Sequence, residues 1–241
     1  MSVKSIVVLG SGRSGTSFLA NLLAENRVYS GDCTQGTREN LQVRKINEDC
    51  LAKQCNGITR SKLPYGILPN KEIIVDDEFQ IRSGDFVKRM AESMPSTWWN
   101  ESDNYWMFKD PRTTLLHDMW VKHCDIIIGV FRNPVEVVES YMKLLEVYYP
   151  GEAKEQGYIN MLNYWKRFNQ SLLHVFNTTD KQKYLLDFND DIDNQTEELF
   201  QMLDIPRTMF RYDVNRREQK SDNIYDDQEV TDIYTNLKNL K

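Results

Sequence analysis

The stretch that decides the fold is Gly10-Ser11-Gly12-Arg13-Ser14-Gly15-Thr16-Ser17, which follows a β-rich run from Ser5 to Leu9. Apolar residues then recur at helical spacing at Phe18, Leu19, Leu22 and Leu23. The pattern predicts a strand, a glycine turn and a helix. In that arrangement the backbone amides of the turn and the positive end of the helix dipole converge on one point. We therefore expect a phosphate or sulfate site here.

This segment departs from the nucleotide P-loop pattern GxxxxGK[ST] at one position. Thr16 follows Gly15, so the lysine that would reach a β- or γ-phosphate is missing. Arg13 stands two residues before that glycine and supplies a cation instead. The substitution weakens a kinase or NTPase interpretation. A glycine turn that only connects a strand to a helix remains the structural alternative.

A second anion-binding segment lies mid-chain, at Val130-Phe131-Arg132-Asn133-Pro134-Val135-Glu136-Val137-Val138-Glu139-Ser140-Tyr141. It places Arg132 at the end of a strand, and Asn133 and Pro134 start the next helix as cap and first residue. Ser140 follows two helical turns later. Arg132 and Ser140 can therefore face one ligand. Alternatively, Arg132 forms a surface salt bridge and Ser140 merely lies in a helix.

Both segments resemble motifs of the sulfotransferase superfamily. The run from Arg13 to Leu19 is similar to the family's 5′-phosphosulfate loop, and Arg132 with Ser140 matches its 3′-phosphate motif. The resemblance implies that 3′-phosphoadenosine 5′-phosphosulfate is the co-substrate, with Arg132 as a bidentate fork on the 3′-phosphate and Ser140 as a hydroxyl donor. It implies that the donor is bound by Gly12, Arg13, Ser14, Gly15, Thr16, Ser17, Arg132 and Ser140. A late basic segment, Asp213 to Arg217, adds Arg216 and Arg217 as weaker candidates.

Sulfuryl transfer needs a cation at the leaving group and a group that takes the acceptor's proton, and it needs no metal. Arg13 is the first candidate for the leaving-group role, and Lys109, in the segment Lys109-Asp110-Pro111-Arg112, is the second. The base is Asp110 or Glu39, with His117 as a third candidate. A loop-capping role for Asp110, a solvated surface charge for Glu39 and a structural role for His117 stay open. The acceptor is a hydroxyl or amine of a small molecule, glycan or peptide.

The remaining pattern predicts a P-loop-like, three-layer α/β/α fold with a mostly parallel sheet, in a single domain over residues 1–241. Segments 32–70 and 213–228 are expected to be substrate or lid loops, and a long helix is expected from Tyr158 to Phe176. The Asp76-Asp77-Glu78 turn and Trp98-Trp99 are further candidates for the acceptor pocket. Further strands are expected at Glu72 to Val75, Trp106 to Phe108, Asp125 to Phe131 and Tyr184 to Leu186.

Composition and charge limit the kinds of binding partner and the compartment to expect. A net charge of -6 argues against a surface built to bind nucleic acid or anionic lipid. No apolar run approaches the roughly 20 residues of a membrane-spanning helix, and no signal peptide is recognisable, so we expect a cytoplasmic protein. The four cysteines form no CxxC pair and no Cys/His metal spacing, which predicts free thiols. A homodimer is compatible with the sequence. A P-loop small-molecule kinase and a non-catalytic nucleotide-binding module are the alternative functions.

Overall fold

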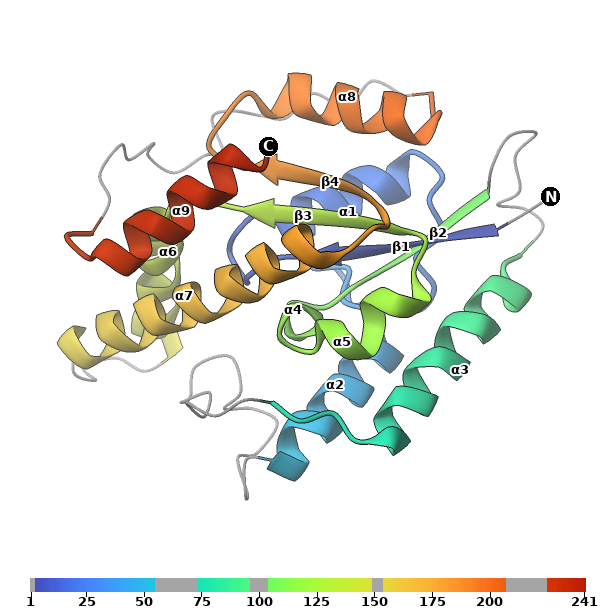
Figure 1. Ribbon diagram of the computed structural model, residues 1–241, viewed down its shortest axis with the longest axis horizontal. Helices are drawn as coiled ribbons and strands as arrows, with labels where there is room; N and C mark the ends of the chain where they lie inside the picture. The colour runs from blue at the N-terminus through green and yellow to red at the C-terminus, as the bar shows by residue number, and fades with distance from the viewer. Residues whose placement is uncertain (1–2, 55–72, 96–103, 149–153, 207–224) are drawn as a thin grey trace.

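In the computed structural model of the chain, the structure describes residues 3–54, 73–95, 104–148, 154–206 and 225–241. Strands and helices alternate along the chain (Figure 1). In order they are β1 (Val3–Leu9), α1 (Thr16–Glu25), α2 (Leu41–Gln54), α3 (Asp77–Ser93), β2 (Asn104–Lys109), α4 (Arg112–Leu115), α5 (His117–Trp120), the 3-10 helix η3 (Val121–His123), β3 (Ile126–Phe131), α6 (Pro134–Tyr148), α7 (Lys154–Thr178), β4 (Gln182–Asp187), α8 (Ile192–Leu203) and α9 (Gln228–Asn239).

The four strands form one sheet in the order β2-β1-β3-β4, and every pair is parallel. The register aligns Ile6 with Ile126 across the central pair. Because all four strands run the same way, their carboxyl ends share one edge of the sheet. In open α/β sheets ligands bind at this edge. The segments that follow Leu9, Lys109 and Phe131 therefore start side by side.

Helices cover both faces of the sheet, as the three-layer prediction requires. Along β1, Ile6 and Val8 pack toward α1 and α8, whereas Val7 and Leu9 face the opposite core. That second core contains α3, α7 and α9 (Figure 1). Every residue of β2 and β3 is buried, as expected for strands covered on both faces. Large aromatic rings fill the second core, with Phe86, Trp106, Phe108 and Trp120 in mutual contact.

Several sequence-based expectations are confirmed locally. The strands after β1 lie at the predicted places, and the helix expected from Tyr158 to Phe176 lies inside α7. Asn133 caps α6, because its side-chain oxygen accepts a hydrogen bond from the Val135 amide at 2.8 Å. Cys33, Cys50 and Cys124 are free thiols, and Cys55 lies outside the described residues.

Other expectations are corrected. Residues 73–75 form no strand, and Glu72 lies outside the described residues. The segment 32–70 is not all loop: α2 occupies Leu41–Gln54, and the part from residue 55 on is not described. Asp76, expected at the acceptor pocket, instead caps the amino end of α3 and forms an ion pair with Lys53. In the part of the chain that the structure describes, no helix is long and apolar enough to cross a membrane.

Candidate functional site

The loop between β1 and α1 is held in a left-handed geometry at several points. Gly10, Arg13 and Gly15 have φ angles of 148°, 65° and 103°. Glycine adopts such angles freely, whereas Arg13 does so against its own steric preference. A single side chain from α4 fixes the start of the loop: the Thr114 hydroxyl accepts a hydrogen bond from the Gly10 amide at 2.8 Å and donates one to the Gly10 carbonyl at 3.1 Å.

The middle of the loop rests on two tyrosines. The Gly12 amide donates to the Tyr164 hydroxyl at 3.1 Å, and Tyr141 donates to the same hydroxyl at 3.1 Å. A Cβ on Gly12 would lie 2.0 Å from the Tyr141 oxygen, so any other residue there forces the Tyr141 side chain to shift. Burial raises the pKa of Tyr164 to about 12, and the phenol therefore stays neutral. No sequence pattern indicates this contact, because Tyr164 lies on α7, far along the chain.

The two anion-binding segments meet directly. Arg13 Nε donates to Ser140 Oγ at 2.8 Å, and Arg132 Nη1 donates to the Arg13 carbonyl at 3.3 Å. The contact joins the loop after β1 to the loop and helix after β3. Arg13 is exposed, and among the described residues no carboxylate lies within ion-pair distance of it. Its guanidinium is therefore available to an anionic ligand.

The predicted bidentate fork of Arg132 is occupied by a residue of α6, the helix that follows it. Arg132 Nε and Nη2 donate to Glu136 Oε2 at 2.7 and 2.6 Å, and Asn189 holds the other oxygen of Glu136 at 2.7 Å. The guanidinium also lies 5.5 Å from the centre of the Phe188 ring. Only Nη1 is turned toward the glycine loop. A ligand here meets one edge of Arg132 and not the free fork that the sequence suggested.

The hydroxyls of the loop differ in what they can offer. Ser14 is fully buried and donates to the Ser11 carbonyl at 2.6 Å. Thr16 is also buried, whereas Ser17 is partly exposed. The buried Ser11 hydroxyl has no hydrogen-bond partner within the described residues. A buried hydroxyl without a hydrogen-bond partner is uncommon, and Ser11 lies in the proposed anion-binding loop. The sequence pattern did not identify this hydroxyl as a candidate.

Lys109 reaches the same place from the end of β2. Its side chain is only 3% exposed, and its Nζ contacts Ser17 Oγ at 3.2 Å, the Thr37 carbonyl at 3.2 Å and Glu39 Oε1 at 3.6 Å. Burial lowers the pKa of Lys109, and the nearby Glu39 and Asp110 oppose that shift. Lys109, on the strand beside β1, thus places a cation at the first turn of α1. The glycine loop itself has no lysine.

The two predicted carboxylate bases lie in different surroundings. Asp110 is fully buried, and Arg112 binds both of its oxygens through Nε at 2.9 Å and Nη2 at 2.5 Å. Glu39 is 19% exposed and lies within 4.0 Å of three cations, Lys109, Arg112 and Arg44. Asp110 therefore has a firm structural contact, and Glu39 retains access to solvent.

The remaining candidates lie elsewhere or outside the described residues. Arg216, Arg217, Trp98 and Trp99 fall in segments that are not described. His117 contacts Asp118 and the ring of His174. Burial lowers the pKa of His117, against the opposing effect of Asp118. Within the described residues, no hydrogen bond or ion pair joins His117 to the Glu39 and Lys109 cluster.

Comparison with known proteins finds similarity among solved structures only. No family model matches the chain, and no curated protein matches it. Among solved structures, the chain is similar to a protein described as the sulfotransferase domain from the curacin biosynthetic pathway. The identity is 16%, the match covers 86% of this chain and 75% of that chain, and the TM-score is 0.48. At this identity and TM-score the similarity assigns no activity to this chain.

Proposed function

We propose that the chain is a sulfotransferase that transfers a sulfuryl group from 3′-phosphoadenosine 5′-phosphosulfate to a hydroxyl or amine. The observation that carries the proposal is the meeting of the two anion-binding segments: the Arg13 side chain donates a hydrogen bond to Ser140, and the Arg13 carbonyl accepts one from Arg132. These residues lie at the carboxyl edge of the parallel sheet, where ligands of open α/β folds bind. Their types and chain order fit a donor that has phosphate groups at both ends.

In this proposal the donor lies along the loop and the start of α6. The amides of the glycine loop and the exposed guanidinium of Arg13 bind the 5′-phosphosulfate. Ser140 and Nη1 of Arg132 bind the 3′-phosphate, while Glu136 holds the other edge of Arg132 in place. A donor without the 3′-phosphate leaves these last two groups unused. Selectivity over ATP and ADP follows from that difference.

The chemical step is an in-line displacement at sulfur. The acceptor oxygen or nitrogen forms a bond to sulfur, and the bond from sulfur to the bridging oxygen of the phosphosulfate breaks. The leaving adenosine 3′,5′-bisphosphate keeps the electron pair, and Arg13 and Lys109 stabilise the charge on its oxygen. Lys109 is suited to this task because its side chain is shielded from solvent and its amine lies at the first turn of α1, beside Ser17.

We propose that Glu39, and not Asp110, takes the proton from the acceptor. Asp110 is fully buried with both oxygens bound to Arg112, so an acceptor has no path to it. Glu39 is partly exposed and lies 3.6 Å from Lys109, the group proposed to contact the leaving oxygen. A base must lie within reach of the proton it takes. Glu39 is the candidate whose position allows this.

Donor selectivity is the first test. Calorimetric titration compares adenosine 3′,5′-bisphosphate with ADP and ATP on wild type and on Arg13→Ala. We expect the 3′-phosphorylated ligand to bind at least about tenfold more tightly than ADP, in line with two charge-assisted hydrogen bonds. Arg13→Ala is the cleaner variant, because replacing Arg132 leaves the buried Glu136 without its cation.

Arg89→Ala is the matched control, since it removes the same charge from the carboxyl-terminal half of α3, far from the carboxyl ends of the strands (Figure 1). Its affinity for adenosine 3′,5′-bisphosphate should equal that of wild type. Equal or tighter binding of ATP by wild type would overturn the proposal in favour of a kinase. Unchanged affinity in Arg13→Ala would remove Arg13 from the donor site.

The base is tested by single-turnover transfer of sulfur-labelled donor to a panel of phenols, amino sugars and tyrosine peptides. Glu39→Gln should slow the transfer by about 10²-fold or more while leaving donor affinity intact. Asp110→Asn serves as the comparison, and its effect should appear mainly in stability, because it weakens the ion pair between fully buried Asp110 and partly buried Arg112. A full transfer rate in Glu39→Gln would exclude this assignment. Donor binding without transfer to any acceptor would favour a non-catalytic nucleotide-binding module.

A further inference from the structure

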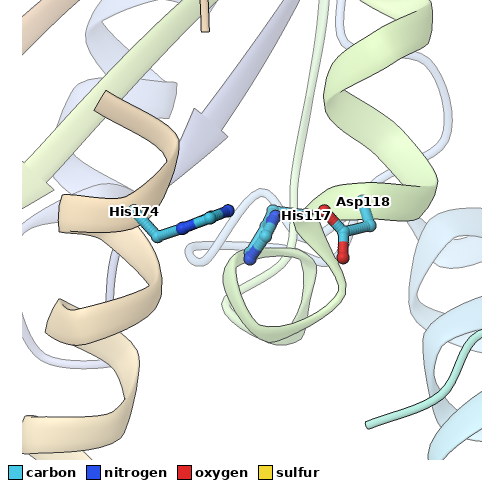
Figure 2. Close-up of side chains that lie close together, drawn as sticks. All are labelled: His117, Asp118 and His174. Carbon is cyan, nitrogen blue, oxygen red and sulfur yellow. Dashed lines mark ion pairs between the residues drawn. The ribbon is translucent and has the colours of Figure 1, made fainter. Parts of the chain in front are cut away.

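Two histidines and one aspartate gather away from the carboxyl edge of the sheet. His117 and Asp118 lie in α5, and His174 lies in the last turns of α7. One potential ligand atom from each of the three side chains lies within 4.8 Å of the others. Figure 2 shows the ring of His174 extending from α7 toward His117, with the carboxylate of Asp118 on the other side of His117. The ring centres of the two histidines are 5.2 Å apart.

The contact between His117 and Asp118 already has the spacing of two metal ligands. His117 Nδ1 and Asp118 Oδ1 are 3.0 Å apart. Ligand bonds of about 2.0–2.1 Å at a tetrahedral angle place neighbouring ligand atoms about 3.3 Å apart. His174 needs to approach by about 1.5 Å to reach the same geometry. Its side chain is exposed and is free to make this movement by rotating, as is the 75% exposed side chain of Asp118.

We propose that His117, Asp118 and His174 form a binding site for a divalent transition metal, with Zn²⁺ as the expected ion. Imidazole nitrogens favour zinc and its first-row neighbours over Mg²⁺ and Ca²⁺, which prefer oxygen ligands. The carboxylate adds the third ligand and a negative charge, and solvent completes the coordination.

The position of the site gives the ion a structural effect. It would connect α5 to α7. Immediately before α5 is α4, which carries Thr114, and α7 carries Tyr164. These two side chains fix the glycine loop at Gly10 and at Gly12. A metal that joins their supporting helices would therefore stabilise the frame that holds the loop, from outside the proposed donor site. The inference is independent of the proposed activity.

The test uses tag-free full-length protein freed of metal with a chelator. Co²⁺ is the spectroscopic probe: binding should produce a visible ligand-field band, which Zn²⁺ then displaces. Removing or neutralising a ligand should cost at least as much as removing an outer-shell partner, so His174→Ala and Asp118→Asn should each bind Co²⁺ at least about tenfold more weakly. The third histidine of the chain, His123, provides the matched control. His123→Ala should bind both metals like wild type.

Thermal unfolding adds a second measurement. Zn²⁺ at about 100 times its dissociation constant should raise the ratio of folded to unfolded protein about 100-fold in wild type and in His123→Ala. In His174→Ala the same Zn²⁺ concentration should raise this ratio only about tenfold or less. Because His174 is exposed, the variant should fold, which an unchanged near-ultraviolet circular dichroism spectrum would verify. Equal Co²⁺ affinity in wild type and His174→Ala would overturn the proposal, as would metal binding that disappears when the cysteines are alkylated.

Discussion

Thr114 supports the glycine loop with one hydroxyl, and its removal should cost more stability than its size suggests. The hydroxyl accepts from the Gly10 amide at 2.8 Å and donates to the Gly10 carbonyl at 3.1 Å, and Thr114 is fully buried. Valine has nearly the same shape but can do neither. Each lost hydrogen bond is worth about 0.5–1.5 kcal/mol, and each buried group left unpaired costs about 1–3 kcal/mol. We therefore expect Thr114→Val to lower the free energy of unfolding by about 2–4 kcal/mol.

Urea unfolding followed by circular dichroism measures this loss. With an m-value of about 3 kcal/mol/M, the midpoint should fall by about 1 M at an unchanged slope. Thr114→Ser is the matched control, because it keeps the hydroxyl and loses one methyl group. It should cost about 1 kcal/mol. The reasoning is refuted if Thr114→Val unfolds at the wild-type midpoint, or if the serine variant is as unstable as the valine variant.

Three other substitutions or reactions probe separate parts of the structure. Gly12→Ala places a Cβ 2.0 Å from the Tyr141 oxygen, so it should cost about 2–3 kcal/mol, and a double-mutant cycle in urea should show Tyr141→Phe recovering about half of that loss. Asp204 ends α8 with a φ of 52°, where glycine is preferred and a carboxylate opposes the helix dipole. Asp204→Gly should therefore raise the free energy of unfolding by about 1 kcal/mol, and Asp204→Asn by less; a lower midpoint for the glycine variant would contradict this. Burial raises the pKa of Cys50 to about 11, so at pH 8 its thiolate fraction is lower than that of an ordinary cysteine by more than about a hundredfold. Mass spectrometry should find Cys50 alkylated slowly in the folded protein, faster as pH rises toward about 11, and rapidly in urea; equal rates in both states would contradict the burial.

Local patterns were sufficient to predict most of the architecture. The glycine turn after Leu9 and the Asn133-Pro134 start of α6 depend on conformational preferences of neighbouring residues, and both are present. The parallel sheet follows from the alternation of short apolar runs with helices. The strand expected at residues 73–75 is absent because an apolar run alone does not specify a pairing partner. Its residues lead instead into the Asp76 cap of α3.

The sequence by itself determined which residue types stand at the carboxyl edge, because strand ends and helix starts are encoded locally. Two pairs at this edge are short-range in the chain: Glu136 occupies the fork of Arg132, and Arg112 closes on Asp110, each within four residues. Only the tertiary structure decided the contacts between residues far apart in the chain. Thr114 and Tyr164 hold the loop from distant helices, and His174 meets His117 across a similar gap. Such contacts depend on how helices pack against the sheet, and no short-range pattern in the sequence records that packing.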